Sequence, residues 1–355
     1  MSKKIWTIAS LAVAAAAGWC TPGVAVAGPL DQKLSNAAPH RAGLPQLTPS
    51  GGRIHIMPTV NGAAALAKAI ADSGPLLYHG GPTMTTATLY AIFWAPPTLQ
   101  NGGPTSIPPH YALVNLLALV DYPFHGIDNI NTQYYQIVGS TKTYILNAGS
   151  FGGFAVDTSP YPASGCTDSF TPGNCITDAQ IQAEIQKVML SKGWTGGLNN
   201  QFLLFTSKGE GSCFDSTSTS CAYTAYCAYH GSIGTSPPII YSNMPFDELS
   251  VCQKPGQPSP NGDPVADAET STASHEISES ITDPLVNVNS AWFTALRNEN
   301  GDLCAYNYGT NTWTSMVAND ANEMWNGRFY ELQQEWDNHA PGGTGGGACA
   351  QVGPS

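Results

Sequence analysis

Apolar residues occur along most of the chain in short runs separated by polar and turn-forming residues, and their spacing predicts both strands and helices. Runs rich in β-branched, aromatic and aliphatic residues predict core strands at residues 88–94, 201–206 and 238–241. Two further runs, residues 134–138 and 143–146, also have the composition of strands. The chain is therefore expected to build a mixed β-sheet.

Helical segments are predicted between these strands. Residues 111–120 are apolar enough for a helix under the core. Thr177 and Gln180 have the spacing of a capping box, and apolar residues follow them at helical intervals. Residues 267–281 contain no Gly or Pro and can form one helix, which the Asp-Pro pair that follows would end.

The two ends of the chain differ from this patterned part. Residues 28–75 are rich in Pro, Gly, Ala and Ser with weak periodicity, which predicts a flexible leader with one short helix at residues 63–71. Residues 351–355 are expected to be a tail. Between them strands and helices alternate without an internal repeat, which predicts one α/β or α+β domain over residues 76–350.

Composition and charge exclude several classes of protein. The 355 residues include 13 Lys and Arg against 25 Asp and Glu, a formal net charge of −12. A nucleic-acid partner is not expected, because phosphate binding needs clustered basic residues. A wholly disordered chain is excluded too, because 42% of the residues are hydrophobic and 10% are aromatic.

The first residues have the features of a secretory signal peptide, residues 1–27. Lys3 and Lys4 form the charged end, residues 8–18 are apolar, and Ala-Val-Ala at 25–27 offers the small residues of a cleavage site. The alternative, a membrane anchor, is disfavoured because the apolar run is too short to span a bilayer. A secreted, extracellular or periplasmic protein is therefore expected, with no membrane attachment after cleavage.

The cysteines support export. Loss of Cys20 with the signal peptide leaves eight, and an even number in an exported chain predicts disulfide bonds. Their spacing does not match a zinc ribbon, because the chain has no two C-x-x-C pairs. We expect the pairs Cys166–Cys175 and Cys304–Cys349, so that one disulfide-stapled domain results. Two more bonds are expected among the other four cysteines: Cys213, Cys221, Cys227 and Cys252.

One part of the 267–281 helix carries candidate metal chemistry. Residues 275–279 read His-Glu-Ile-Ser-Glu, which has the form HExxE. Positions i and i+4 share one helix face, so that His275 and Glu279 can reach the same ion. Glu276 lies one step further round, where a general base could address a metal-bound water. The arrangement resembles the zinc helix of HExxH metalloproteases with Glu in place of the second His, and it predicts a zincin-like active helix against the sheet.

Further ligands are expected downstream, where Glu299 and Asp302 occur, as in zincins with a distal Glu ligand. Zn²⁺ is the expected ion, and Ca²⁺ or Mn²⁺ are alternatives because one His with carboxylates is an oxygen-rich set. The competing interpretation is an exposed helix face with two acids and a His. Two observations oppose it: only 11% of the residues are charged, and Ala273 and Ile277 interleave with the motif, which suggests burial.

Two other histidines stand in short, recognisable segments. His230 follows Cys-Ala-Tyr at 227–229 and could polarise a substrate or stabilise an oxyanion, with a structural role as the alternative. His79 lies beside Gly and Pro residues, so that a turn or core position is expected for it.

Several segments together resemble known extracellular proteins. The sequences YHGGP (78–82), LYAIFW (89–94) and CAYH (227–230) resemble parts of the plant EXORDIUM / phosphate-induced protein family. Exported bacterial proteins with a SHExxExxTDP segment are a closer resemblance. The segments of this chain that resemble those of the bacterial proteins are residues 274–284, Trp292-Phe293, NENGDLC at 298–304 and LQQEW at 332–336.

The resemblance implies a metal site common to both groups. Its ligands would be His275, Glu279 and Glu299, with Glu299 favoured over Asp302 as the third, and Glu276 would fit a shared catalytic base. The plant members are regarded as extracellular proteins of growth and nutrient response without an established enzymatic activity. The resemblance is therefore also compatible with a metal that only stabilises the fold.

Two functions follow as hypotheses. The first is a secreted zinc-dependent hydrolase, foremost a metallopeptidase, that acts on a peptide or a cell-surface polymer with Glu276 as base and His230 at the oxyanion. The alternative is a non-catalytic EXORDIUM-like protein that binds cell-surface or carbohydrate partners. Its metal site would be structural, with Asp302 closing the coordination shell.

Overall fold

The computed structural model describes residues 46–47, 53–64, 75–99 and 108–352, except residues 125, 172, 235, 249, 255, 257, 287, 311–320 and 341–345. All of them belong to one compact unit, His40–Ser355. The expected signal peptide, residues 1–27, lies outside the described residues. None of the helices in this described part is long and apolar enough to cross a membrane.

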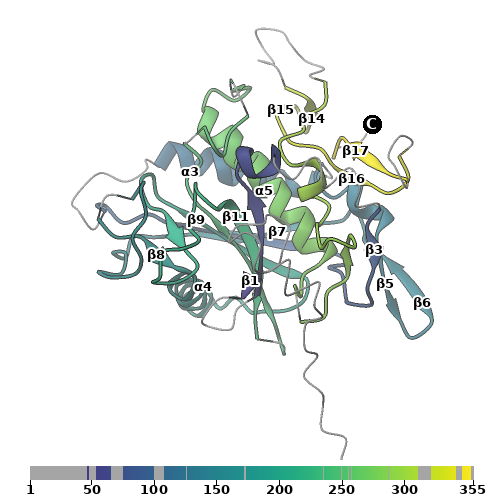
Figure 1. The fold of residues 1–355 in the computed structure, drawn as a ribbon, viewed down its shortest axis with the longest axis horizontal. Helices are drawn as coiled ribbons and strands as arrows, with labels where there is room; N and C mark the ends of the chain where they lie inside the picture. Colours follow the sequence, from purple (N-terminus) through teal and green to yellow (C-terminus); the bar gives the residue numbers. More distant parts are fainter. Residues whose placement is uncertain are drawn as a thin grey trace, which may run out of the picture. The chain divides into compact units, whose positions relative to one another are not determined.

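A seven-stranded sheet runs through the unit in the order β1-β2-β11-β12-β9-β4-β7 (Figure 1). The neighbours from β1 to β12 are antiparallel, and those from β12 to β7 are parallel, so the sheet is mixed. The strands in this order are β1 (Gln46–Leu47), β2 (Arg53–Pro58), β11 (Tyr226–Ile233), β12 (Ile239–Met244), β9 (Asn200–Thr206), β4 (Thr88–Trp94) and β7 (Ser150–Asp157).

Helices and short strand pairs complete the described part of the unit. The helices are α3 (Pro108–Val114), α4 (Asp178–Lys192) and α5 (Pro264–Thr282), with the π-helix η1 (Asn115–Val120) and the 3-10 turns η2 (Tyr122–Phe124), η3 (Ile130–Gln133) and η4 (Asp302–Cys304). The paired short strands are β8 (Ile176–Thr177) with β10 (Ser212–Cys213), β3 (Leu77–Tyr78) with β13 (Trp292–Phe293), β5 (Tyr135–Val138) with β6 (Thr141–Tyr144), β14 (Glu323–Trp325) with β15 (Arg328–Tyr330), and β16 (Glu335–Asp337) with β17 (Ala348–Ala350).

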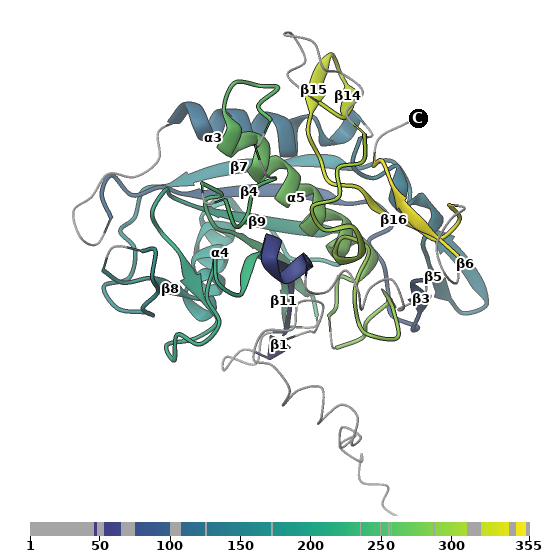
Figure 2. The same cartoon turned by 45° about the horizontal axis from the view of Figure 1, so that its top comes forward.

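Helices lie on both faces of the sheet (Figure 2). Successive residues of one strand contact different helices, because side chains alternate between the two faces. On β11, the Tyr229 hydroxyl donates a hydrogen bond to Asp178, the first residue of α4. The next residue, His230, points to the other face and contacts Glu276 of α5. Helices α4 and α5 therefore cover opposite faces of the sheet, and the face toward α5 is the one that carries histidine.

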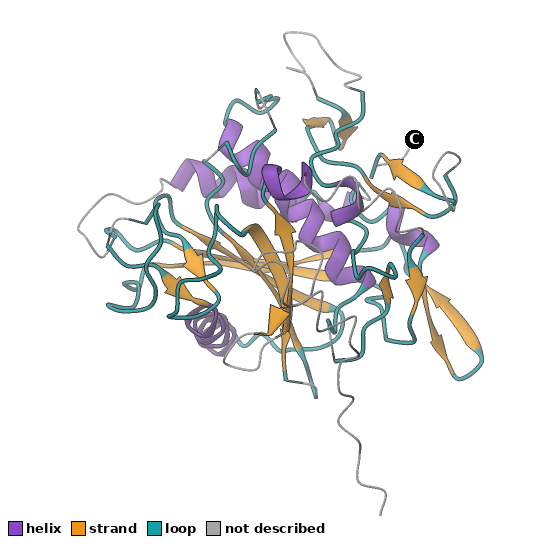
Figure 3. Ribbon diagram, viewed as in Figure 1, coloured by secondary structure: helices purple, strands orange, loops and turns teal. Residues whose placement is uncertain are grey.

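Helix α5 is unusual in being buried and polar. Asp263 caps it by accepting hydrogen bonds from the backbone N–H groups of Val265 and Ala266, and Pro264 occupies the first turn. Every residue from Ala266 to Thr282 is buried, although Ser, Thr, Asp, Glu and His make up most of them. Figure 3 shows the helix crossing the strands of the sheet. Buried polar groups need partners, so this helix is where a buried functional site is to be sought.

The structure confirms several expected elements. The predicted strands 88–94, 201–206 and 238–241 correspond to β4, β9 and β12. The capping box of Thr177 and Gln180 is formed at the start of α4. The helix expected at 267–281 lies inside α5, and that expected at 111–120 divides into the end of α3 and the π-helix η1.

Strand β2 lies inside the range that was expected to be a flexible leader, residues 28–75. Residues 53–58 pair with both β1 and β11 inside the sheet, so the folded unit begins before residue 76. Ile54, His55 and Ile56 are all buried, because both faces of this strand are covered. Residues 60–64 form a short helical segment, whereas the rest of the helix expected at 63–71 lies outside the described residues.

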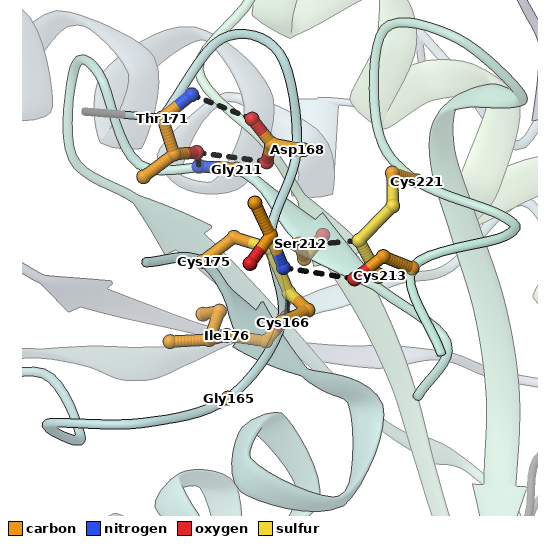
Figure 4. The surroundings of a disulfide bond; sticks show 12 residues. Gly165, Cys166, Asp168, Thr171, Cys175, Ile176, Gly211, Ser212, Cys213 and Cys221 are labelled. Atoms are coloured by element: carbon orange, nitrogen blue, oxygen red, sulfur yellow. Dashed lines mark hydrogen bonds between the residues drawn. A yellow bond between two sulfur atoms is a disulfide. The ribbon is translucent and has the colours of Figure 1, made fainter. Parts of the chain in front are cut away.

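The eight cysteines form four disulfides. Cys166–Cys175 and Cys304–Cys349 are the expected pairs, and the other four cysteines pair as Cys213–Cys221 and Cys227–Cys252. Two of the bonds lie side by side next to the β8–β10 pair (Figure 4), with 3.5 Å between the sulfur atoms of Cys175 and Cys213. These sulfurs are covalently paired and are not available as thiolate metal ligands.

Candidate metal centre

Two buried histidines project from neighbouring strands toward helix α5. His55 on β2 is directly opposite His230 on the antiparallel strand β11, and neither residue is exposed to solvent. Their ring centroids are 5.8 Å apart. Directly opposite residues project from the same face of a sheet, so the register of β2 and β11 places two imidazoles side by side.

Two carboxylates complete a four-residue group with these rings. Glu279 Oε2, from α5, lies 3.2 Å from His55 Nδ1 and 3.5 Å from His230 Nδ1. Glu299, from the segment after α5, places Oε1 3.8 Å from His55 Nδ1 and Oε2 3.6 Å from His230 Nε2. One donor atom of each residue lies within 4.8 Å of the others. Four donors about 2.0–2.1 Å from one tetrahedral ion are about 3.3–3.4 Å apart, and the contacts of His55 Nδ1 and His230 Nε2 with the two carboxylates, at 3.2, 3.8 and 3.6 Å, are near this value.

The second nitrogen of each ring has an acceptor of its own. His55 Nε2 lies 3.2 Å from the carbonyl oxygen of Arg297, to which Nε2–H can donate. His230 Nδ1 lies 3.2 Å from Glu276 Oε2, so Nδ1–H can donate to that carboxylate. With these bonds, a metal ion would use the lone pairs of His230 Nε2, which has no partner, and of His55 Nδ1, which faces Glu279 Oε2, as an outer hydrogen bond prepares a histidine to bind a metal.

Unpartnered atoms mark the same place. His230 Nε2 and Glu299 Oε2 are buried, face each other across 3.6 Å, and form no hydrogen bond. Buried polar atoms in native proteins nearly always have a partner. A cation between the imidazole and the carboxylate would satisfy both atoms at once.

The HExxE motif forms a second, adjoining group. His275 and Glu279 lie on one face of α5, with 3.1 Å between His275 Nε2 and Glu279 Oε1. Asp302 joins them at the start of η4, and its backbone N–H donates to Glu279 Oε1 over 3.0 Å. One donor atom each from His275, Glu279 and Asp302 lie within 4.8 Å of one another. Glu279 therefore belongs to both groups.

The structure brings all the sequence-predicted site residues into one buried cluster but divides their roles differently. The expected ligand set of His275, Glu279 and Glu299 does not occur as a group in the described residues, because His275 lies with Asp302 instead. The interpretation of the motif as an exposed helix face is wrong, since His275, Glu276 and Glu279 are fully buried.

Two residues have a different position from the expected one. His230, expected beside an oxyanion, lies among the candidate ligands. Glu276, expected as a catalytic base, has Oε2 at hydrogen-bond distance from His230, while its Oε1 has no partner.

Sequence analysis did not identify His55. It lies within residues 28–75, whose Pro, Gly, Ala and Ser content predicts a leader. The alternation of Ile54, His55 and Ile56 is the feature that indicates a strand with a buried histidine.

Buried acids outnumber buried histidines in this cluster. Burial raises the pKa of Glu299 well above its ordinary value, and the carboxylates of Asp283 and Glu279 raise it further. Burial together with Glu279 raises the pKa of Asp302 to about 7. Burial acts the same way on Glu279, but His275 and His55 outweigh it and hold the pKa of this carboxyl well below its usual range.

His55 responds to the same imbalance, whereas burial lowers the pKa of His230. Burial opposes the charged form of His55, yet the Asp302 and Glu279 carboxylates raise its pKa to about 10. The cluster is thus a place where positive charge is strongly favoured. A divalent cation supplies such charge without burying another side chain.

The segment that carries Glu299 and Asp302 approaches α5 closely because Gly301 has no side chain. A Cβ at position 301 would lie 2.7 Å from His275 Nδ1 and 2.9 Å from Glu279 Oε1. The φ angle of Gly301 is −65°, which any residue can adopt. Glycine is therefore required at position 301 because a side chain would not fit between this segment and α5.

Comparisons with known proteins give no match: no family model, curated protein or solved structure matches the chain.

A separate cavity of about 570 Å³ lies beside β4, β7 and α3. It is lined by apolar side chains such as Phe93, Phe154 and Val156, and by no residue of the cluster. The geometry of the cluster is thus the basis for a functional proposal.

Proposed function

We propose that the protein is an exported metalloprotein that holds a divalent cation between its central sheet and helix α5. The ligands are His55, His230, Glu279 and Glu299. The observation that carries this proposal is the pair of buried, unpartnered atoms, His230 Nε2 and Glu299 Oε2, inside a four-donor group that is at most 1% exposed. Leaving such atoms without a partner would cost several kcal/mol on folding, at about 1–3 kcal/mol each.

Zinc is the ion that the donor set favours. Two imidazole nitrogens and two carboxylate oxygens, within 4.8 Å of one another, are ligands that Zn²⁺ binds readily. Calcium takes six to eight oxygen ligands, so two nitrogens in a set of four disfavour it. Manganese accepts both donor types and is the remaining alternative.

A structural role for this ion is the function that the geometry supports best. Structural zinc sites have four protein ligands and no open position, whereas catalytic sites keep one position for water. Here the four side chains are at most 1% exposed and come from β2, β11, α5 and the segment after α5. The ion would join parts of the chain that are distant in sequence and would stabilise the fold together with four disulfides.

This role agrees with the resemblance to extracellular plant proteins without an established activity. The protein would then act outside the cell as a stable module that binds a surface polymer or carbohydrate. Its metal would be needed for the fold rather than for turnover.

A zinc-dependent peptidase is a second candidate, and one observation favours it. Glu276 Oε1 is buried, has no hydrogen-bond partner, and belongs to a residue that contacts the candidate ligand His230. A bound zinc ion would supply a water of lowered pKa. Glu276 would take the proton from that water and return it to the leaving amine. Peptidase activity requires a coordination position for water on the zinc ion, in addition to those that the four protein ligands occupy.

Metal content and thermal stability together test the proposal. The mature protein, purified from an exporting host, is expected to contain zinc by elemental mass spectrometry and to lose thermal stability when a chelator removes it. His55→Ala is expected to lose the ion, and a peptide library is expected to remain uncleaved. A protein without metal, whose melting temperature is unchanged by chelator, would overturn the proposal. Cleavage by the parent but not by Glu276→Gln would establish the peptidase instead.

A further inference from the structure

We propose that Glu279 bridges two divalent cations, the second of which is bound by His275, Glu279 and Asp302. This inference rests on the first ion proposed above. The two carboxylate oxygens of Glu279 face different partners: Oε2 lies 3.2 Å from His55 Nδ1, and Oε1 lies 3.1 Å from His275 Nε2. A carboxylate with one oxygen in each of two donor groups is the geometry of a bridging ligand, and two-metal sites hold their ions about 3.5–4 Å apart.

Unpartnered atoms mark the second position as well. His275 Nε2 lies close to Glu279 Oε1 and yet forms no hydrogen bond with it or with another group, and Asp302 Oδ1 is also without a partner. Both residues are at most 1% exposed. At 3.1 Å, a missing hydrogen bond means that the ring nitrogen is not aligned with the oxygen. Two donors of one ion have this relation, because each directs its lone pair at the ion rather than at the other donor.

The outer contacts of His275 fix the position of its ring. Its Nδ1 lies 2.9 Å from the side-chain amide of Gln333, which also contacts Glu335. The same amide nitrogen donates to the Gly301 carbonyl oxygen over 3.2 Å, so Gln333 ties the ring of His275 to the segment that carries Asp302. Oε2 of Glu335 is a further buried oxygen without a partner at this end of the cluster.

The balance of charge favours a second cation. Six carboxyl groups are buried within the cluster, and only three imidazoles accompany them: Glu276, Glu279, Asp283, Glu299, Asp302 and Glu335, with His55, His230 and His275. One divalent ion balances the carboxylates of Glu279 and Glu299 and leaves four carboxyl groups. Buried carboxylates without a compensating charge are costly, and a second ion reduces that cost.

The two proposed metal positions differ in their number of protein ligands. The first has four protein ligands, whereas the second has three, His275, Glu279 and Asp302. A three-ligand ion retains a position for water or an added ligand, as catalytic metal ions do. The second position would therefore take a divalent ion such as Zn²⁺ or Mn²⁺ and would exchange it more readily than the first.

Metal stoichiometry tests the inference directly. The full mature protein is stripped with a chelator, titrated with Zn²⁺ and, after gel filtration, measured by elemental mass spectrometry. We expect two equivalents in the parent and one in Asp302→Asn and His275→Gln. His110→Gln replaces another buried histidine that contacts carboxylates but lies outside the cluster, so it is the matched control and should keep two.

A spectroscopic measurement adds a test that needs no variant. The parent loaded with Mn²⁺ should show the electron paramagnetic resonance spectrum of two coupled ions, and Asp302→Asn that of one isolated ion. One equivalent in the parent, unchanged in both variants, would overturn the second site while the first stands. Two equivalents retained in both variants would place the second ion elsewhere and also refute the assignment. No bound metal in the parent would overturn both proposals.

Discussion

His55 and His230 are directly opposite each other on the antiparallel strands β2 and β11, with both rings on the face that α5 covers. This relation gives the sheet the nitrogen donors of the proposed centre, while α5 and the segment after it supply the carboxylates. The donors come together only when the sheet and the helix are packed. Metal binding is therefore expected to be coupled to folding.

His55→Ala is expected to remove the first ion and to destabilise the protein. Zinc at a thousand times its dissociation constant stabilises a fold by about 4 kcal/mol. In a protein of this size, this corresponds to a shift in the melting temperature on the order of 10 °C. Scanning calorimetry with and without chelator should show this shift in the parent and not in His55→Ala. The exposed His79, which stacks on Phe293, gives the control variant His79→Gln. A chelator effect that persists in His55→Ala would exclude this residue as a ligand.

Glu276→Gln separates the two proposed functions. If Glu276 only orients His230 through the 3.2 Å contact at Nδ1, the variant should retain zinc with an affinity that is about 10–100-fold weaker. Competition with a chromophoric chelator measures this change. Glu248→Gln, which removes an ion pair with Lys208 at the surface, is the control and should not affect affinity. Unchanged affinity with loss of a measurable peptidase activity would contradict the orienting role and support a catalytic one.

Much of the parallel half of the sheet could be predicted from local sequence. Strands β4 and β9 are continuous apolar runs, because buried parallel strands are covered on both faces. The edge strand β7 was not predicted, since Ser150–Asp157 contains glycines and alternates only weakly. Strand β2 was missed because its six residues stand in a region whose overall composition is that of a linker.

The candidate site could be predicted only where its ligands are close in sequence. The spacing of His275 and Glu279 places them on one helix face, and this local rule holds in the structure. The partners of these residues are set by strand register and by the path of the segment after α5, which no spacing encodes. The pairing of β2 with β11 is therefore what identifies His55 and His230 as members of the ligand group.

Gly301→Ala is expected to weaken both metal positions without altering the backbone conformation. The added methyl group would lie 2.7 Å from His275 Nδ1 and 2.9 Å from Glu279 Oε1, so these buried side chains must move. We expect the zinc affinity to fall at least tenfold in the chelator competition. Gly197→Ala is the matched control, because its nearest neighbouring side-chain atom is 3.7 Å away. Equal affinities of the two variants would show that the approach at Gly301 does not position the ligands.

A buried histidine outside the cluster, His110, should make stability depend on pH. His110 is 6% exposed, and its Nδ1 and Nε2 lie 2.9 Å from Asp263 and 3.0 Å from Glu269. Although burial opposes the charge, the hydrogen bond and carboxylate of Glu269, with those of Asp263, raise the pKa of His110 to about 9 from 6.5. The folded pKa exceeds the unfolded one, so the contribution is fully present below pH 6.5 and is lost as the pH rises through 9.

The size of this contribution is on the order of 3 kcal/mol, because each pKa unit corresponds to about 1.36 kcal/mol. His110→Asn keeps a polar side chain but cannot carry the charge. Denaturant unfolding of the parent and the variant at pH 6 and pH 10, each loaded with zinc, measures the difference in free energy of unfolding. That difference should be large at pH 6 and small at pH 10. His339→Asn, at an exposed position, should give a difference near zero at both values. A difference for His110→Asn that is equal at pH 6 and pH 10 would mean that His110 contributes as a neutral hydrogen-bonding group, and that its contacts with Asp263 and Glu269 do not depend on its charge.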